Sequence, residues 1–119
     1  MSAAPDPRTF RSNREIAIHV PDLAQAEAFY GKVLGFRMVR RSLDQLEFDT
    51  GELRLYVNRD ASSLIPYIPS FDVDDYHQAR QFLEAAGCML KFAGDQATYF
   101  QDPFGFVFDI VERPRERSE

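Results

Sequence analysis

The sequence predicts an α+β fold made of two βαβββ modules, each a strand, a helix and three further strands. The first observation is a repeat: Ile16–Leu23 leads into a helical pattern that ends near Gly35, and Ile68–Asp74 leads into another that ends near Gly87. The second observation is periodicity. Apolar residues alternate in the strand segments and recur every three to four positions in the helical ones. One module used twice therefore accounts for most of the 119 residues.

The composition is typical of a single globular domain in water. The chain is 45% hydrophobic and 28% charged, with a formal net charge of -5. An acidic chain without a basic stripe disfavours nucleic acid as a partner and favours cationic ligands. The one cysteine, Cys88, excludes an internal disulfide, and no apolar segment resembles a signal peptide or a membrane span. We therefore expect a cytoplasmic protein that binds neither nucleic acid nor membranes.

The first module begins after a polar segment. Residues 1–13 are rich in Pro, Arg and Ser and are expected to form a flexible tail. From Glu15 to Val20 the residues alternate, which predicts a half-buried strand with Glu15, Ala17 and His19 on one face.

A helix and three strands are expected to complete this module. Asp22 is a suitable N-cap, with Gln25 as the second residue of a capping box, and Gly35 is a suitable end for the helix. Ala61–Pro66 is expected to be the loop between the modules. The three strands are predicted at Phe36–Arg41, Leu46–Asp49 and Leu53–Asn58.

The second module repeats this order. Tyr67–Val73 is the predicted opening strand, Asp74 or Asp75 caps the helix, and Gly87 ends it. The remaining strands are predicted at Met89–Phe92, Ala97–Gln101 and Phe106–Val111. The chain therefore reads as one domain over residues 14–113, with modules at 14–60 and 66–113 and a second flexible tail at 114–119.

Three motifs point to a known family. They are Val20-Pro-Asp-Leu23, Phe29-Tyr-Gly-Lys-Val-Leu-Gly-Phe36 and Tyr99-Phe-Gln-Asp-Pro-Phe-Gly105. They resemble the vicinal oxygen chelate (VOC) superfamily, which includes glyoxalase I, extradiol dioxygenases and the fosfomycin and bleomycin resistance proteins. The resemblance implies the glyoxalase/bleomycin resistance fold, in which the modules form an open, cup-shaped β-barrel around a ligand cavity. It also implies a homodimer.

The resemblance also assigns positions for a metal. Members with metal chemistry hold a divalent ion such as Ni, Mn, Fe or Zn with His and Glu side chains on the first and last strands of each module. The corresponding positions are taken as Glu15, Arg54, Ile68 and Asp109. Isoleucine donates no lone pair and arginine is cationic, so we expect no metal cofactor. A guanidinium can bridge two carboxylates, which predicts a Glu15–Arg54–Asp109 network at the cup floor.

His19 has two interpretations. It shares a strand face with Glu15 and is therefore expected to point into the cup. It is either a hydrogen-bonded wall residue, or a metal ligand or general base in a shifted site of Glu15, His19 and Asp109. Phe104 and Phe106 are likewise either a wall for ligand stacking or a dimer contact.

Alternation along the strands gives the complete expected lining, and no catalytic residue is assigned. The cup-lining, ligand-binding positions are Glu15, Ala17, His19, Arg54, Tyr56, Asn58, Ile68, Ser70, Asp72, Val107 and Asp109.

Two classes of function follow. The first is a small-molecule-binding protein similar to the bleomycin resistance proteins, which sequesters a cationic or aromatic ligand in a metal-free cup, as in antibiotic resistance. The second is a metal-dependent enzyme of the glyoxalase kind, a lyase or isomerase, or a dioxygenase, using the shifted site. A third reading is a regulatory or subunit domain with no small ligand.

Overall fold

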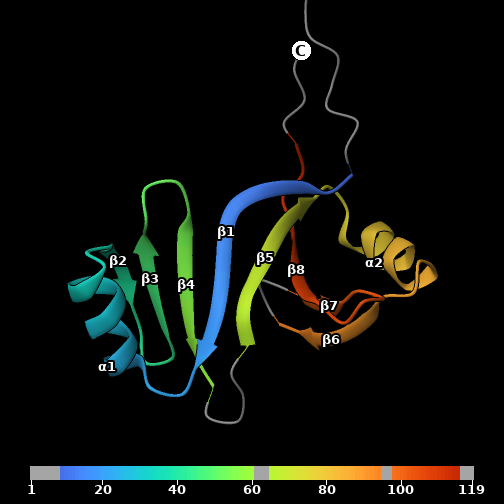
Figure 1. Ribbon diagram of the computed structural model, residues 1–119. Helices are drawn as coiled ribbons and strands as arrows, with labels where there is room; N and C mark the ends of the chain where they lie inside the picture. Colours follow the sequence, from blue (N-terminus) through green and yellow to red (C-terminus); the bar gives the residue numbers. More distant parts are fainter. Residues whose placement is uncertain (1–8, 61–64, 95–97, 116–119) are drawn as a thin grey trace, which may run out of the picture. The chain divides into compact units, whose positions relative to one another are not determined.

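The computed structural model describes residues 9–60, 65–94 and 98–115, and it confirms the predicted α+β class with two βαβββ modules (Figure 1). The elements are β1 (Arg11–Val20), α1 (Leu23–Ala26), η1 (Glu27–Val33), β2 (Arg37–Arg41), β3 (Gln45–Asp49), β4 (Arg54–Arg59), β5 (Ile65–Val73), α2 (Tyr76–Ala85), β6 (Met89–Ala93), β7 (Thr98–Gln101) and β8 (Val107–Glu112).

The chain divides into two compact units. The first unit is Arg14–Ser70, and the second contains the residues up to Asn13 together with Phe71 onward. The boundary falls within β5, after the predicted bridge at Ala61–Pro66. Part of that bridge, residues 61–64, lies outside the described residues, and Ile65 and Pro66 already belong to β5.

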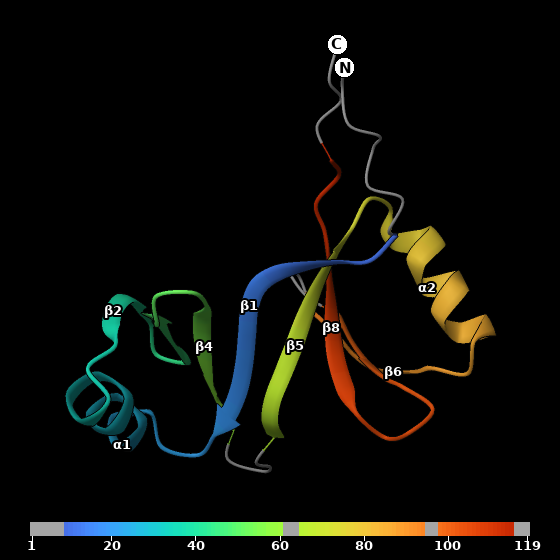
Figure 2. The same ribbon diagram turned by 45° about the horizontal axis from the view of Figure 1, so that its top comes forward.

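In the first unit, the four strands of the first module follow the order β2-β3-β4-β1, with β1 parallel to β4 and the other pairs antiparallel. The helix formed by α1 and η1 covers one face (Figure 2). Between helix and sheet lies an apolar core that includes Ile18, Leu46, Phe48 and Val57. The opposite face of this sheet carries polar side chains.

The eight described strands belong to one sheet, in which β5, β8, β7 and β6 follow β1 in that order, and β5 enters the second unit at Phe71. We call β2-β3-β4-β1 the first sheet and β5-β8-β7-β6 the second sheet. In the second unit, α2 packs on a core of its own. That core consists of Val73, Ala79, Leu83, Phe100 and Ile110. Phe48 and Phe100 are both fully buried and lie 52 positions apart, so the two cores have corresponding centres.

Both helices begin with the same aspartate cap. The side chain of Asp22 accepts a hydrogen bond from the backbone N–H of Gln25 at 3.2 Å, and Asp75 accepts one from Gln78 at 3.0 Å. Each cap satisfies an N–H that has no partner inside the helix. The structure therefore selects Asp75 over Asp74 as the second N-cap.

Both helices end where the backbone needs glycine. Gly35 has φ 78° and Gly87 has φ 97°, a left-handed conformation that is unfavourable for residues with a Cβ. The first helix differs from the prediction in one respect. From Glu27 it takes π-helical hydrogen bonding, in which the N–H of Leu34 donates to the carbonyl of Phe29 at 2.9 Å.

The outer strands carry matching irregularities. The pairing of β2 with β3 shifts register between Met38 and Arg40, and the pairing of β6 with β7 shifts between Leu90 and Phe92. Each shift leaves one extra residue in the outer strand, Val39 and Lys91 respectively, as in a β-bulge. The repeat thus extends to the defects in the two sheets.

Both predicted tails are shorter than expected, because charged side chains anchor their inner ends. β1 begins at Arg11, which pairs with Asp74 at 3.2 Å. Asn13 donates to Asp72 at 3.0 Å. At the other end, Arg115 donates to Asp74 through its backbone N–H and its guanidinium. The outer parts of the tails, residues 1–8 and 116–119, lie outside the described residues.

Candidate functional site

The polar face of the first sheet brings six predicted lining residues together. Cα partners in the parallel pair β1–β4 are Glu15 with Arg54, Ala17 with Tyr56, and His19 with Asn58. Residues paired in this way point to the same side of a sheet. The antiparallel pair β3–β4 adds three residues that the sequence analysis did not select: Gln45, Glu47 and Asp49.

Glu47 is the buried charge on this face. It is 7% exposed, and its carboxylate accepts a hydrogen bond from Arg54 Nη1 at 2.5 Å. Arg40 approaches the same carboxylate at 4.0 Å. The hydrogen bond to Glu47 raises the pKa of the Arg54 guanidinium, although desolvation acts in the opposite direction. Arg54 is therefore held as a cation beside a carboxylate.

This arrangement changes the predicted Glu15–Arg54–Asp109 network. The partner of Arg54 in the first unit is Glu47, which escaped prediction because it lies between the buried Leu46 and Phe48. Successive residues of a strand point to opposite faces, so the buried Leu46 and Phe48 on either side of Glu47 predict that Glu47 lies on the polar face. Glu15 lies beside Arg54 in register, and Asp109 belongs to the second unit, so their part in the network stays a prediction.

A second carboxylate at this face is also paired. Asp49 accepts a hydrogen bond from the N–H of Gly51 at 2.8 Å and one from Arg37 at 2.9 Å. These two bonds, that of Gly51 first, hold the pKa of the Asp49 carboxyl below its usual range. This end of the face therefore carries matched charges, Glu47 with Arg54 and Asp49 with Arg37.

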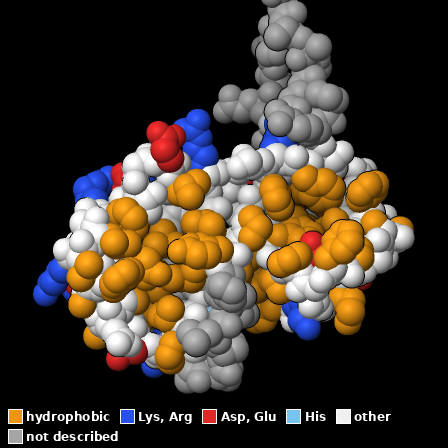
Figure 3. Space-filling model, in the orientation of Figure 1, with side chains coloured by type: hydrophobic (Ala, Val, Ile, Leu, Met, Phe, Trp, Pro, Cys, Tyr) orange, Lys and Arg blue, Asp and Glu red, His pale blue; other side chains and the backbone are white. Residues whose placement is uncertain are grey.

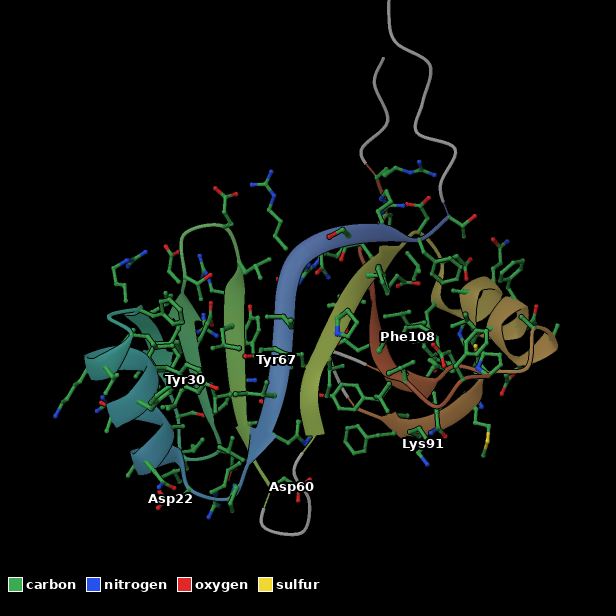
Figure 4. The ribbon with its side chains drawn as sticks, in the orientation of Figure 1. Asp22, Tyr30, Asp60, Tyr67, Lys91 and Phe108 are labelled. Atoms are coloured by element: carbon green, nitrogen blue, oxygen red, sulfur yellow. The ribbon has the colours of Figure 1, made fainter. Side chains whose placement is uncertain are left out.

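The other end of the face carries Gln45, Asn58 and His19. Gln45 donates to Asn58 at 2.7 Å, and His19 Nδ1 lies 3.4 Å from the carboxylate of Asp60, which follows β4 (Figure 4). His19 is thus held by a carboxylate in its own unit. A carboxylate at Nδ1 can orient an imidazole whether the residue is a wall group or a base, so both interpretations of His19 stay open.

The register corrects one assigned position. Glu47 pairs with Tyr56, and Tyr99 pairs with Asp109. Arg54 therefore corresponds to Val107, and the residue that corresponds to Asp109 is Tyr56. The difference arises because the turn before β4 is one residue shorter than the turn before β8. The four positions taken from the resemblance then read Glu15, Tyr56, Ile68 and Asp109.

The remaining predicted residues of β5 are buried or engaged. Ile68 is 0% exposed and Ser70 is also buried. Asp72 accepts hydrogen bonds from Asn13 at 3.0 Å and from Arg113 at 3.1 Å. Asp72 thus fastens chain segments at the end of β5, and its predicted contact with a ligand stays untested.

The second sheet has a different polar face. Val107 and Asp109 in β8 pair with Gln101 and Tyr99 in β7, and Phe92 in β6 pairs with Tyr99. Asp109 is 7% exposed. In neither unit do the described side chains of His, Cys, Asp and Glu form a group of three that could hold a metal ion.

A rigid turn presents two aromatic rings beside this sheet. The carboxylate of Asp102 accepts hydrogen bonds from the N–H groups of Phe104 at 2.9 Å and Phe106 at 3.0 Å. Gly105, with φ 104°, makes the turn sterically accessible. The two phenylalanines are nevertheless 86% and 72% exposed. Figure 3 shows hydrophobic side chains over both units, with acidic atoms among those of the second unit.

Comparison with known proteins defines the class. Residues 14–110 match the family model of the Glyoxalase/Bleomycin resistance protein/Dioxygenase superfamily, and the chain belongs to this superfamily. No curated protein matches the sequence. In the described residues, no helix has the length and apolar character needed to cross a membrane.

Solved structures share the fold at low sequence identity. A variant of Homoprotocatechuate 2,3-Dioxygenase from B. fuscum is 18% identical with a TM-score of 0.67, over 92% of this chain and 34% of that chain. Its complex with 3,4-dihydroxyphenylacetate, from Brevibacterium fuscum, is 19% identical with the same TM-score, over 92% and 38%. A hypothetical protein from Bacillus halodurans is 11% identical with a TM-score of 0.66, over 94% and 100%. This chain thus spans about a third of the dioxygenase.

Proposed function

We propose that this chain is a small-molecule-binding protein of the superfamily, which binds a cationic or aromatic ligand without the usual metal site. One observation carries the proposal: Ile68, fully buried, occupies one of the four positions at which the resemblance expects a ligand atom. Tyr56 occupies another, and its neutral phenol is a poor replacement for a carboxylate or imidazole. Two carboxylates remain, Glu15 and Asp109.

The charge pairing in the first sheet supports the same proposal. Arg54 is the register partner of Glu15 on the neighbouring strand. A metal bound near Glu15 would therefore lie close to the Arg54 guanidinium. The bond to Glu47 keeps that guanidinium in place. Repulsion between the guanidinium and a metal ion on neighbouring strands disfavours metal binding.

Metal analysis of the purified full chain tests the proposal. After expression in medium containing Ni, Mn, Fe and Zn and dialysis against buffer without chelator, mass spectrometry should find each metal far below one equivalent. About one equivalent of any of them would overturn the proposal. That result would favour the enzyme with the shifted site of Glu15, His19 and Asp109.

Ligand class is tested by thermal shift. The melting temperature of the metal-free protein is measured with cationic glycopeptides, aromatic acids and neutral sugars as controls. A true ligand should raise the melting temperature progressively with its concentration, because it binds only the folded state. Absence of any shift in both candidate classes would count against the binding function and favour a regulatory or subunit role.

We also propose that two copies of the chain associate through Phe104 and Phe106. The turn that carries them is fixed by Asp102, so little conformational freedom is lost when the rings are buried. Light scattering should show a dimer for the natural chain and a monomer for the double variant Phe104→Ser/Phe106→Ser. A dimer that survives both substitutions would assign the rings to another role.

A further inference from the structure

We propose that the face of the second sheet opposite α2 binds an organic ammonium group, with Asp109 supplying the charge and the rings of Tyr99 and Phe92 covering it. The inference rests on the small-molecule binding proposed above and names the chemistry of the ligand. It concerns side chains of the second unit alone.

Backbone register places the three side chains together. Tyr99 is the partner of Asp109 in β8 and of Phe92 in β6, so the three follow one another across the sheet on the same face. The rings of Phe92 and Tyr99 lie 5.9 Å apart at 54° to each other. The other face at these strands belongs to the core, with Phe100 and Ile110.

Accessibility differs along this row. Asp109 is 7% exposed, whereas Phe92 is 59% exposed, so a ligand can reach the row from the side of β6. Covering the exposed Phe92 ring with a ligand removes apolar surface from water, which is favourable. A largely buried carboxylate also attracts a cation more strongly than a carboxylate in water. The aromatic end is thus the open end of the row.

These groups suit an alkylammonium ion. Its charge is spread over the attached CH groups, which favours contact with the faces of aromatic rings within about 6 Å of their centres. A nearby carboxylate adds direct charge attraction. Asp109 already makes contacts in the protein, but a carboxylate accepts about four hydrogen bonds, which leaves acceptor capacity for a ligand.

Comparison with the first sheet shows why the cation would choose this face. The residues that correspond to Phe92, Tyr99 and Val107 are Arg40, Glu47 and Arg54, which already pair with one another. In the second sheet, Asp109 has the aromatic Tyr99 as its register partner in β7, and Tyr99 has the aromatic Phe92 as its partner in β6. Lys91 lies in the bulge beside Phe92 and is exposed (Figure 4).

The net charge of the second unit also favours binding of a cation. The sequence of the second unit, residues 1–13 and 71–119, contains eleven Asp and Glu against seven Lys and Arg, whereas residues 14–70 contain eight against seven. A cation is therefore attracted to the second unit more than to the first, in a way that salt screens.

The test uses choline and its neutral analogue 3,3-dimethylbutan-1-ol, in which carbon replaces the charged nitrogen. Titration of the full chain, followed by NMR shifts of its aromatic protons, should show saturable binding of choline. The neutral alcohol should bind roughly tenfold more weakly. Equal binding of the two compounds would overturn the inference, because the charge would then contribute nothing.

Two variants separate charge from aromatic contact. Asp109→Asn should weaken choline binding about tenfold and reduce its salt dependence, and Tyr99→Leu should weaken it about two- to fivefold. Glu84→Gln, which removes an exposed negative charge on α2, is the matched control and should bind like the natural chain. If Asp109→Asn is unstable, the result for Tyr99→Leu decides. Choline binding unchanged in either folded variant would overturn the inference.

The outcome is independent of the metal test. If choline does not bind but an aromatic acid raises the melting temperature of the metal-free chain, the ammonium site is wrong and the binding function stands. If metal is found at one equivalent, the binding function without metal is wrong whatever choline does.

Discussion

The two sheets have the same backbone and opposite chemistry on the face away from their helices. In the first sheet, Glu47 and Arg54 form a close ion pair, with Arg40 nearby. At the corresponding positions of the second sheet stand Tyr99, Val107 and Phe92. The comparison teaches that the repeat fixes the scaffold and the core, whereas the open faces were free to diverge. One face is neutralised internally, and the other keeps a carboxylate among aromatic rings.

The largest expected effect tests whether the shared core makes the two units equal. Phe48→Ala and Phe100→Ala remove corresponding, fully buried rings, and each should lower the free energy of unfolding by about 3–5 kcal/mol. Urea unfolding followed by circular dichroism measures this. The control is Leu43→Ala, which truncates a side chain that is 89% exposed and should change stability by less than about 0.5 kcal/mol. A loss confined to one core variant would show that the two units differ in packing.

A smaller effect is expected from the ion pair of the first sheet. Glu47→Ala removes the carboxylate that Arg54 binds, and it should lower the free energy of unfolding by less than either core substitution, because water can reach the partly exposed guanidinium. The double variant Glu47→Ala/Arg54→Ala should be less destabilised than the sum of the single variants, because the pair is lost only once. Additive effects in a urea double-mutant cycle would mean that the two side chains do not stabilise each other.

The smallest effect is a pH dependence that both units should share. The pKa of Asp49 is lowered by hydrogen bonds from Gly51 and Arg37, and that of Asp74 by bonds from Arg115. A carboxyl whose pKa is lower in the folded state stabilises the fold above its unfolded pKa, near 3.9, and this contribution is lost as the pH falls through the folded value.

Each substitution of these aspartates by asparagine should therefore make the melting temperature fall less steeply as the pH is lowered. Asp49→Asn and Asp74→Asn should be less stable than the natural chain near pH 7 and closer to it near pH 2. Melting temperatures measured between pH 2 and pH 7 test this. Asp44→Asn, which changes an exposed carboxylate that pairs with Arg59, is the comparison and should change the curve less. A parallel curve for Asp74→Asn would contradict the assigned cause.

Local signals in the sequence were sufficient for the scaffold. The caps at Asp22 and Asp75 and the left-handed glycines at 35 and 87 depend only on neighbouring residues, and the structure has them where the repeat predicts. The π-helical hydrogen bonding from Glu27 was not predictable, because it widens the helix without changing which residues are apolar.

The site was harder to predict because it depends on pairing between strands. Arg54 was matched to Asp109 by counting along the chain, and one residue of difference between two turns moved the match to Tyr56. The partner of Arg54, Glu47, lies on a neighbouring strand and gives no signal near Arg54 in the sequence. The pairing of Arg11 with Asp74 is also a long-range contact, so the first three residues of β1 were assigned to the tail.

The matching bulges in β2 and β6 have a consequence for how the chain behaves at high concentration. These strands end the order of their sheets, and an outer strand offers backbone groups to any extended peptide. The bulges at Val39 and Lys91 break the regular spacing of these backbone groups. In addition, β2 carries positive charge at Arg37, Arg40 and Arg41. A foreign strand could therefore form only short ladders on either side, which protects the protein from growing into fibrils.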